Sequence, residues 1–226
     1  DKLSRRKLLR ELTLHTKLVI ITTLILLVSG TIFIYCFEYN NITTMANDSN
    51  GVKLLKSAFQ STTLRTAGFS TINQNEMTTV TKLISICYMF IGGSPVGTAG
   101  GIKTVTFLVM IITAISVIRN RRTANVFGRQ ISDEAIRKAV GVFVMSFCVV
   151  AVSTILLSYV TNADFLDVIY ETVSATATVG LTRNLTPSLN TWGKLIITIA
   201  MFLGRVGPIS LAVALNKNKG SENIVS

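Results

Sequence analysis

Two copies of a Thr-x-Gly motif carry the clearest chemical signal in this sequence. The first copy is Thr66-Ala67-Gly68 and the second, 112 positions later, is Thr178-Val179-Gly180. A turn lined by carbonyl groups needs backbone angles that a side chain would forbid, and glycine allows them. Carbonyl oxygens can replace the water shell of a potassium ion, and a threonine hydroxyl can add a ligand at the inner end. The six residues therefore predict a potassium-binding filter.

The same offset continues beyond the two motifs. Without a gap it pairs Lys82-Leu83-Ile84 with Lys194-Leu195-Ile196, Met89-Phe90 with Met201-Phe202 and Gly92 with Gly204. These identities indicate an internal duplication. In each copy the motif lies between a short apolar segment and a long one, which is the order of a membrane–pore loop–membrane unit. The alternative is a helix end capped by glycine, and repetition at a fixed offset between such segments disfavours it.

A glycine-rich stretch interrupts the longest apolar run. Residues 78–118 would be about 60 Å long as one straight helix, which is twice the thickness of the membrane core. Residues 92–103 break this run with five glycines and a proline. We expect one crossing with a non-helical loop at membrane depth, because two crossings would place the arginines at 119–122 outside. A nucleotide-binding loop is disfavoured, because Ile102 separates glycine from lysine and no strand precedes the stretch.

The glycine-rich stretch and an intramembrane arginine together predict a gate on the cytoplasmic side of the filter. Arg205 lies within the last apolar run, where a charge is costly to bury and is therefore a functional candidate. Glycines let the loop move at small cost, and a fixed positive charge raises the barrier for a cation. For Lys103 the alternative is that it only anchors the end of the loop. The predicted gate residues are Gly92, Gly93, Ser94, Pro95, Gly97, Thr98, Gly100, Gly101, Lys103 and Arg205.

Two charged residues are candidate scaffold residues for the filter. Arg65 directly precedes the first motif, but the residue before the second motif is Ala177. Because the duplication does not keep this charge, we do not expect Arg65 to bind the ion. Glu171 lies on the second predicted pore helix, and we hypothesise that Arg65 and Glu171 form an ion pair beside the filter.

The composition is that of a membrane protein. Of the 226 residues, 49% are hydrophobic and only 15% are charged, and the apolar residues form runs of about twenty, enough to cross a bilayer. The three cysteines and the single His15 have no spacing of a disulfide framework or a metal site, and no nucleophile–base set or carboxylate pair predicts an enzyme. No cofactor is predicted in this chain. The net charge is +11, and the basic residues cluster beside apolar runs, which favours contacts with membrane lipid over nucleic acid.

These features predict an all-α integral membrane protein with two membrane–pore loop–membrane repeats. We expect a cytoplasmic lead-in at residues 1–17, the first repeat at 18–118, a basic cytoplasmic connector at 119–138, the second repeat at 139–215 and a cytoplasmic tail at 216–226. The predicted spanning helices are 18–37, 139–160 and 191–215, and the predicted pore helices are 52–63 and 164–175. The excess of Lys and Arg in the inner segments supports this orientation.

Three motifs together resemble the Trk/Ktr/HKT potassium-uptake family, and in particular its bacterial Ktr membrane subunit. They are the duplicated loop with one filter glycine, the break Gly-Gly-Ser-Pro-x-Gly-Thr-Ala-Gly-Gly-Ile-Lys-Thr, and Gly-Arg-x-Gly-Pro. The resemblance implies a multi-pass protein of the bacterial cell membrane with four repeats around one pore, like a potassium channel. This chain resembles the last two repeats. We therefore expect the other two in a chain about twice as long, rather than a half-pore completed elsewhere.

The resemblance also implies partners. It implies a homodimer and a cytosolic ring of nucleotide-binding regulatory subunits, which alone would hold the nucleotide and would contact the basic connector. The ion is expected to be potassium, with coupling to sodium left open, and one glycine per loop implies looser selectivity than in potassium channels. A non-conducting membrane scaffold or receptor with a pore-like fold is the second class of function.

Overall fold

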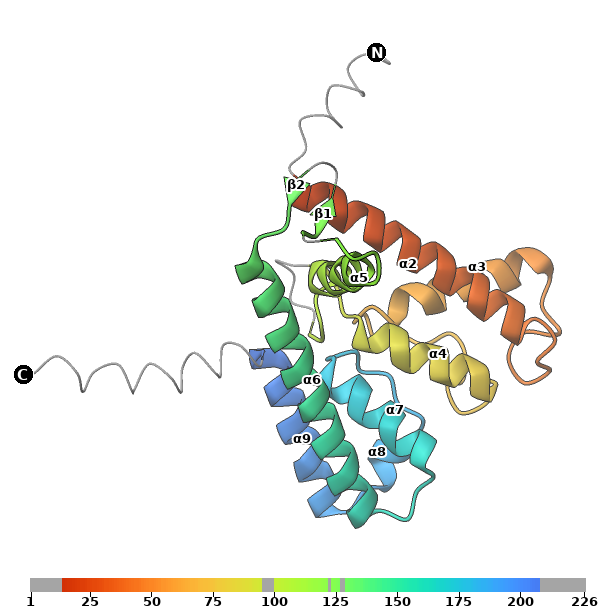
Figure 1. Ribbon diagram of the computed structural model, residues 1–226. Coiled ribbons are helices and arrows are strands. Elements are labelled where there is room, and N and C mark those ends of the chain that lie inside the picture. Colours follow the sequence, from red (N-terminus) through yellow and green to blue (C-terminus); the bar gives the residue numbers. More distant parts are fainter. Residues whose placement is uncertain (1–13, 95–99, 122, 127–128, 208–226) are drawn as a thin grey trace, which may run out of the picture.

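The computed structural model describes residues 14–94, 100–121, 123–126 and 129–207, and this part of the chain is mostly helical (Figure 1). The elements in order are α2 (Leu14–Glu38), α3 (Asn50–Thr63), α4 (Thr79–Phe90), α5 (Thr104–Ile118), β1 (Asn125–Val126), β2 (Arg129–Gln130), α6 (Asp133–Val160), α7 (Phe165–Thr176), α8 (Leu185–Ser188) and α9 (Thr191–Val206). The prediction of an all-α fold is confirmed.

The helices form two units with the same order of elements. In the first unit the long helix α2 is followed by the short helix α3, a loop and then α4. In the second unit α6 is followed by α7, a loop with the short α8, and α9. The units meet where α4 of the first contacts α7 of the second (Figure 1).

The outer surface of the long helices is apolar. On α2 the side chains of Leu24, Ile25, Val28 and Ile32 are each more than half exposed. Within the described residues, two helices are long and apolar enough to cross a membrane, Thr16–Glu38 and Asp133–Val160. Exposed apolar faces of this length fit contact with lipid or with further membrane helices.

The interior, in contrast, is rich in small polar residues, which let membrane helices approach closely and bond to one another. In the first unit the Ser61 hydroxyl of α3 donates to the carbonyl of Leu27 in α2 at 2.9 Å. In the second unit the hydroxyls of Thr154 in α6 and Thr172 in α7 are 2.8 Å apart and hydrogen-bonded. In both units a hydroxyl bond therefore fixes the short helix against the long one.

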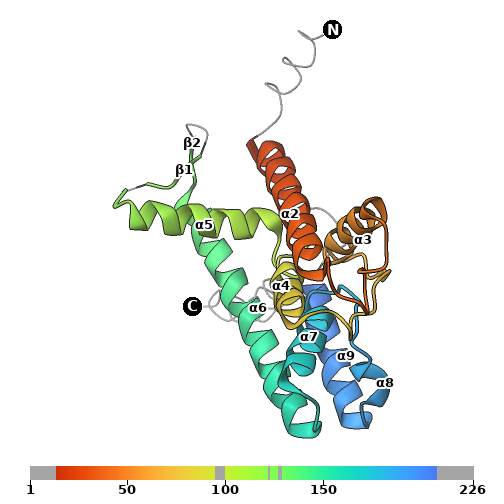
Figure 2. The same cartoon turned by 90° about the vertical axis from the view of Figure 1, so that its right-hand side faces the viewer.

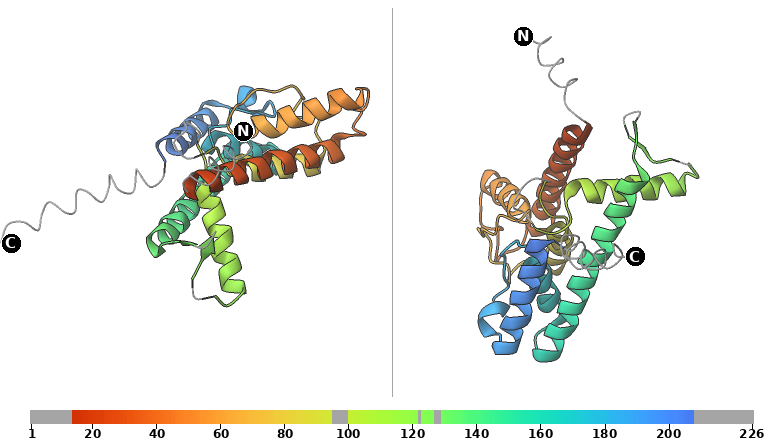
Figure 3. Two further views of the ribbon diagram at one scale, coloured as in Figure 1. Left: turned by 90° about the horizontal axis from the view of Figure 1, so that it is seen from above. Right: turned by 90° about the vertical axis from the view of Figure 1, so that its left-hand side faces the viewer.

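Helices α4 and α5 do not share an axis. α5 is seen end-on in Figure 1 and lengthwise in Figure 2, where it lies across the direction of α2 and α6. Figure 3 shows the same crossing from above. The chain between the two helices is non-helical over residues 91–94 and 100–103, and a parallel bridge joins Ile91 to Ile102. This agrees with the predicted interruption, but the expected single crossing consists of two helices that point in different directions.

The second unit begins six residues earlier than the expected boundary at residue 139. α6 begins at Asp133, because the Ser132 hydroxyl accepts the N–H of Ala135 at 3.3 Å and so caps the helix. Asp133 and Glu134 lie in its first turn, where negative charge is favourable. The connector before this helix holds the antiparallel pair β1 and β2.

Helix α9 ends at Val206, before the end of the crossing predicted to run to residue 215. Gly207 has a φ of 81°, and its N–H donates to the carbonyl of Leu203 at 3.2 Å. A glycine in this conformation ends a helix without strain. The rest of the predicted crossing and the tail, like most of the lead-in, lie outside the described residues.

Candidate functional site

The two Thr-x-Gly motifs lie against each other in the centre of the fold. Each motif follows the end of a short helix, α3 or α7. A β-carbon on Gly68 would collide with the carbonyl oxygen of Val179, and one on Gly180 would lie 3.9 Å from the Cα of Gly68. The structure therefore brings the two predicted filter loops together at one place, and glycine permits the close approach.

The backbone of both motifs alternates in handedness. The φ angles of Thr66 and Gly68 are 69° and 78°, and those of Thr178 and Gly180 are 56° and 87°, whereas the residue between each pair does not have a positive φ. Alternating left- and right-handed residues turn successive peptide groups to the same side. A carbonyl-lined loop has this geometry, and the two copies share it.

A positive φ is expected for the glycines but not for the threonines. A β-branched residue in the left-handed region is strained by about 1–3 kcal/mol. Both Thr66 and Thr178 adopt this conformation, so the surrounding structure must hold them there. Strain repeated at corresponding positions is typical of a functional site.

The short helices direct their carboxyl ends at the motifs. α3 ends at Thr63 and α7 at Thr176, and neither carries a basic residue in its last turn. The carboxyl end of a helix holds roughly half a negative charge. Two such ends beside the motifs create a field that favours a cation.

A hydroxyl bond closes each motif onto its short helix. The Thr63 hydroxyl donates to the carbonyl of Phe69, and the Ser174 hydroxyl donates to that of Leu181 at 2.6 Å. Phe69 and Leu181 are 112 positions apart, but Thr63 and Ser174 are 111 apart. The gapless offset therefore does not hold for the short helices, because the second copy has one additional residue between the bonded hydroxyl residue and the motif.

Arg65 and Glu171 do not pair with each other in the described part of the chain. The Arg65 guanidinium donates to the carbonyl of Gly92 at 3.4 Å. The buried Glu171 carboxylate instead accepts the hydroxyl of Thr182 at 2.7 Å and both the N–H (3.2 Å) and the hydroxyl of Thr186. The hypothesis of an ion pair is wrong, because the loop after the second motif satisfies Glu171 with its own donors.

The glycine-rich stretch reaches the second motif directly. The N–H of Gly100 donates to the Thr178 hydroxyl at 2.8 Å, and a β-carbon on Gly100 would collide with that side chain. Together with the bond from Arg65 to Gly92, this places one described part of the stretch against Thr178 of the second motif and the other against Arg65, which directly precedes the first motif. Of the predicted gate residues, Pro95, Gly97 and Thr98 lie outside the described residues.

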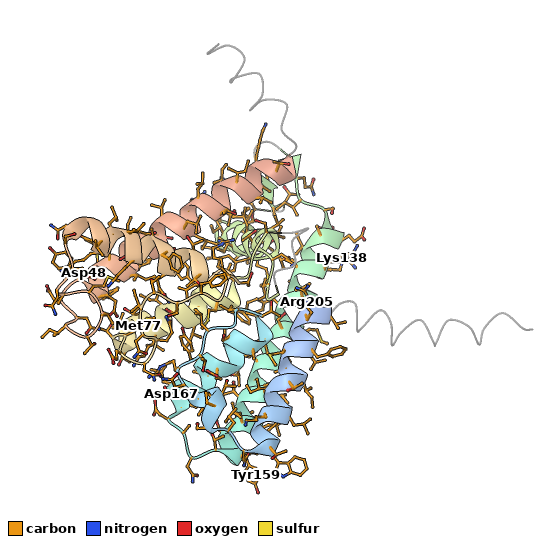
Figure 4. The ribbon with its side chains drawn as sticks, turned by 180° about the vertical axis from the view of Figure 1, so that it is seen from behind. Asp48, Met77, Lys138, Tyr159, Asp167 and Arg205 are labelled. Carbon is orange, nitrogen blue, oxygen red and sulfur yellow. The ribbon has the colours of Figure 1, made fainter. Side chains whose placement is uncertain are left out.

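Arg205 lies close to the second motif but on a different helix. Figure 4 shows it at the end of α9, on the side of Lys138 and away from Tyr159, the two residues that mark the ends of α6. Its exposed side chain lines an open cavity of about 490 Å³ together with Thr178 and Gly180. The predicted gate arginine and the second motif thus face one space.

A buried polar cluster behind the first motif was not predicted. Gln60 of α3, Gln74 of the loop that follows the motif and Tyr170 of α7 are at most 4% exposed and hydrogen-bond to one another. Polar side chains at membrane depth are costly unless they are satisfied. A glutamine within a pore-helix segment is the signal in the sequence that could have identified this cluster.

Glu38 is a second buried polar residue that sequence reasoning missed. Its carboxylate is fully buried at the end of α2 and accepts the side-chain amide of Asn41 and the hydroxyl of Thr44, each at 2.7 Å. It also accepts the N–H of Thr78 at 2.8 Å, just before α4 begins. Glu38 therefore connects the loop that follows α2 to the start of α4.

Known proteins with similar sequences are cation transporters. The model of the TrkH family, described as cation transport protein, matches residues 2–226. The chain is 37% identical over 212 residues to Ktr system potassium uptake protein B of Bacillus subtilis, covering 94% of this chain and 48% of that protein. It is 33% identical over 210 residues to potassium/sodium uptake protein NtpJ of Enterococcus hirae, covering 91% and 46%. The chain spans about half the length of the curated relatives it matches.

The fold is similar to a solved structure. The crystal structure of the potassium transporter TrkH from Vibrio parahaemolyticus matches with a TM-score of 0.70 over 86% of this chain and 43% of that one, at 17% identity. At this identity the likeness concerns the fold alone.

Proposed function

The chain belongs to the TrkH family of cation transport proteins, as its motifs predicted, and we propose that it contributes two of four filter loops to a potassium-uptake pore. The observation that carries this proposal is the contact between the two Thr-x-Gly loops, with matching positive φ angles at both ends of each motif. Two further repeats would complete the ring of carbonyl oxygens. The coverage of about half of each relative supports this number.

The proposed filter acts by replacing water. Potassium loses its hydration shell only where oxygens are already positioned to replace it. Carbonyl groups of the motifs, which contain Thr66, Ala67, Gly68, Thr178, Val179 and Gly180, would supply these oxygens. The negative ends of α3 and α7 add electrostatic attraction for the cation.

The glycine-rich stretch and Arg205 form the proposed gate. The stretch is bonded to the second motif through Gly100 and to Arg65 through Gly92, so a displacement of the stretch would alter contacts of the filter itself. Arg205 and Lys103 would place positive charge on the cytoplasmic side, where it opposes the passage of a cation. The cavity shared by Arg205 and Thr178 supports this position.

The names of the relatives support the wider setting of the proposal. Two of them are Ktr system potassium uptake proteins, which favours a bacterial cell-membrane protein that works with a regulatory subunit. We assign homodimer formation and binding of a cytosolic nucleotide-binding ring to the whole protein, with the basic connector and its β1–β2 pair as the contact surface. The name of NtpJ includes sodium, which keeps sodium coupling within the proposal.

Potassium uptake tests the proposal. The whole protein, expressed in a bacterial host that lacks its own potassium uptake, is expected to restore growth at low potassium. Gly68→Ser and Gly180→Ser are expected to lower the preference for potassium over sodium, because a side chain disturbs the ring of carbonyl oxygens. Gly141→Ser on α6 is the matched control, because a β-carbon there meets no atom within 4 Å.

Two outcomes would contradict the proposal. Protein that reaches the membrane but restores no growth would favour the non-conducting scaffold or receptor. Unchanged potassium and sodium kinetics in both glycine variants would show that ions do not pass the two motifs.

A further inference from the structure

Gln74 is the centre of a buried hydrogen-bond network that crosses between the two repeats. Its side-chain oxygen accepts the hydroxyl of Tyr170 at 2.8 Å and the amide of Gln60 at 2.9 Å. Its side-chain nitrogen donates to the carbonyl of Ile72 at 2.8 Å and to the hydroxyl of Ser70 at 2.9 Å. The amide therefore uses both of its donors and accepts two hydrogen bonds.

The network joins three separate segments. Gln60 belongs to α3, Gln74 belongs to the loop that leaves the first motif, and Tyr170 belongs to α7 of the second repeat. Tyr170 and Gln60 are fully buried, and Gln74 is 4% exposed. In such surroundings a lost partner leaves a polar atom unsatisfied, so the network strongly prefers one geometry.

The position of the network relates it to the filter. Gln74 lies six residues after Gly68, and Tyr170 lies on the helix that ends just before the second motif. The two motifs also contact each other at Gly68 and Val179. The bond from Tyr170 to Gln74 therefore spans the same boundary between repeats as the filter itself.

We propose that Gln60, Gln74 and Tyr170 are positioning residues for ion selectivity, which hold the first filter loop at a fixed distance from the second repeat. We call these three residues the inter-repeat clamp. A carbonyl ring that fits potassium discriminates against the smaller sodium ion only while its loops resist moving inward. The clamp resists this movement from behind the first loop. This inference rests on the proposed function.

Removal of one hydroxyl group tests the clamp. Tyr170→Phe keeps the ring but removes the bond to Gln74. We expect the ratio of the sodium KM to the potassium KM to fall by about three- to tenfold, in line with the loss of one hydrogen bond, with a smaller change in maximal rate. Gln74→Met is the second variant and should lower the ratio at least as much, because it also removes the bonds to Gln60, Ser70 and Ile72. The double variant should lower the ratio no further than Gln74→Met alone, since that change already breaks the bond to Tyr170.

Tyr88→Phe is the matched control. The Tyr88 hydroxyl bonds to that of Ser29 at the same distance of 2.8 Å, but it joins α4 to α2 within the first repeat. Its removal should leave the KM ratio unchanged. All variants are compared as the whole protein, at measured amounts in the membrane, in the potassium-dependent host.

The remaining outcomes overturn the inference. An unchanged KM ratio in Tyr170→Phe and Gln74→Met would show that the clamp does not position the filter. An equal fall in Tyr88→Phe, or the loss of Tyr170→Phe from the membrane, would assign the hydroxyl to general folding. Failure of the wild-type protein to take up potassium would instead contradict the proposed function, and it is observed before any variant is compared.

Discussion

In both repeats, the loop that follows the Thr-x-Gly motif is hydrogen-bonded to the short helix at corresponding positions, but with different chemistry. In the first repeat the neutral amide of Gln60 bonds to Gln74, whereas in the second the carboxylate of Glu171 bonds to Thr182 and Thr186. Gln60 and Glu171 are 111 positions apart, as are the two hydroxyl residues that close the motifs. The two copies therefore share the hydrogen bond between helix and loop, although they form it with different residue types.

The difference has an energetic consequence. A buried carboxylate cannot be left without donors, and hydrogen bonds to charged groups contribute more than neutral ones. Glu171 is 3% exposed and accepts several bonds from one loop. Glu171 thus fixes the second loop to the short helix of its own repeat, whereas Gln74 in the first loop also accepts a hydrogen bond from Tyr170 of the other repeat.

The largest effect is expected from exchanging the charges of the two scaffold residues. Glu171→Arg buries a cation among donors, which should abolish potassium uptake. Adding Arg65→Glu should not restore it, because the native side chains contact separate loops. Uptake by the single and double variants is the measurement. Recovery in the double variant would show that the two residues pair after all.

Truncation of Glu171 and Gln60, the residues that bond each short helix to its loop, should give the next largest effects. The two losses of stability should be unequal. Glu171→Ala leaves several buried donors without an acceptor and should lower the free energy of unfolding by roughly 3 kcal/mol or more. Gln60→Ala should lower it by about 1–3 kcal/mol. Denaturant unfolding of the purified protein in detergent measures both. Equal losses would mean that charge makes no difference between the anchors.

The two motif threonines should differ in a kinetic property. Thr178→Val removes the acceptor of the Gly100 N–H and should raise the maximal potassium flux by about two- to tenfold, the weight of one hydrogen bond. Thr66→Val also removes a hydroxyl from the proposed filter, but it should not raise the maximal flux, because Thr66 has no such bond to the described part of the stretch. Initial uptake rates at saturating potassium distinguish the two. Equal changes in the maximal flux of the two variants would show that Thr178 has no particular role in gating.

The smallest difference should come from two ion pairs, each of which joins a short helix to a neighbouring loop. The Arg183–Asp167 pair of the second repeat is more buried at its cation (9% exposed) than the Lys56–Asp48 pair of the first (28%). Lys56→Ala should change the free energy of unfolding by about 0–1 kcal/mol. Arg183→Ala should cost more, because it leaves Asp167 without its partner. The reverse order in thermal unfolding would contradict this comparison.

The sequence predicted the parts of the fold that follow from periodicity and repetition. The two motifs, their short helices and the interruption after Phe90 all rest on local composition, and the structure has each of them. The partner of Glu171 could not be predicted this way, because the Thr182 and Thr186 donors approach it only after the loop folds back. The additional residue between Ser174 and the second motif could not be predicted from the repeat. Most identities between the two copies fall at the offset of 112, and they conceal the offset of 111 in the short helix alone.

Helix α5 links the connector to the glycine-rich stretch, so a movement of the connector can be passed on to the stretch. It is a stiff rod of 15 residues, about 22 Å long, that lies across α2 and α6 and contacts β1 of the connector. At its near end the N–H of Thr104 is bonded to the carbonyl of Gly93 at 3.3 Å. A push on the connector therefore acts as torque on the stretch, and a tilt of about 5° displaces one end of the rod by about 2 Å relative to the other.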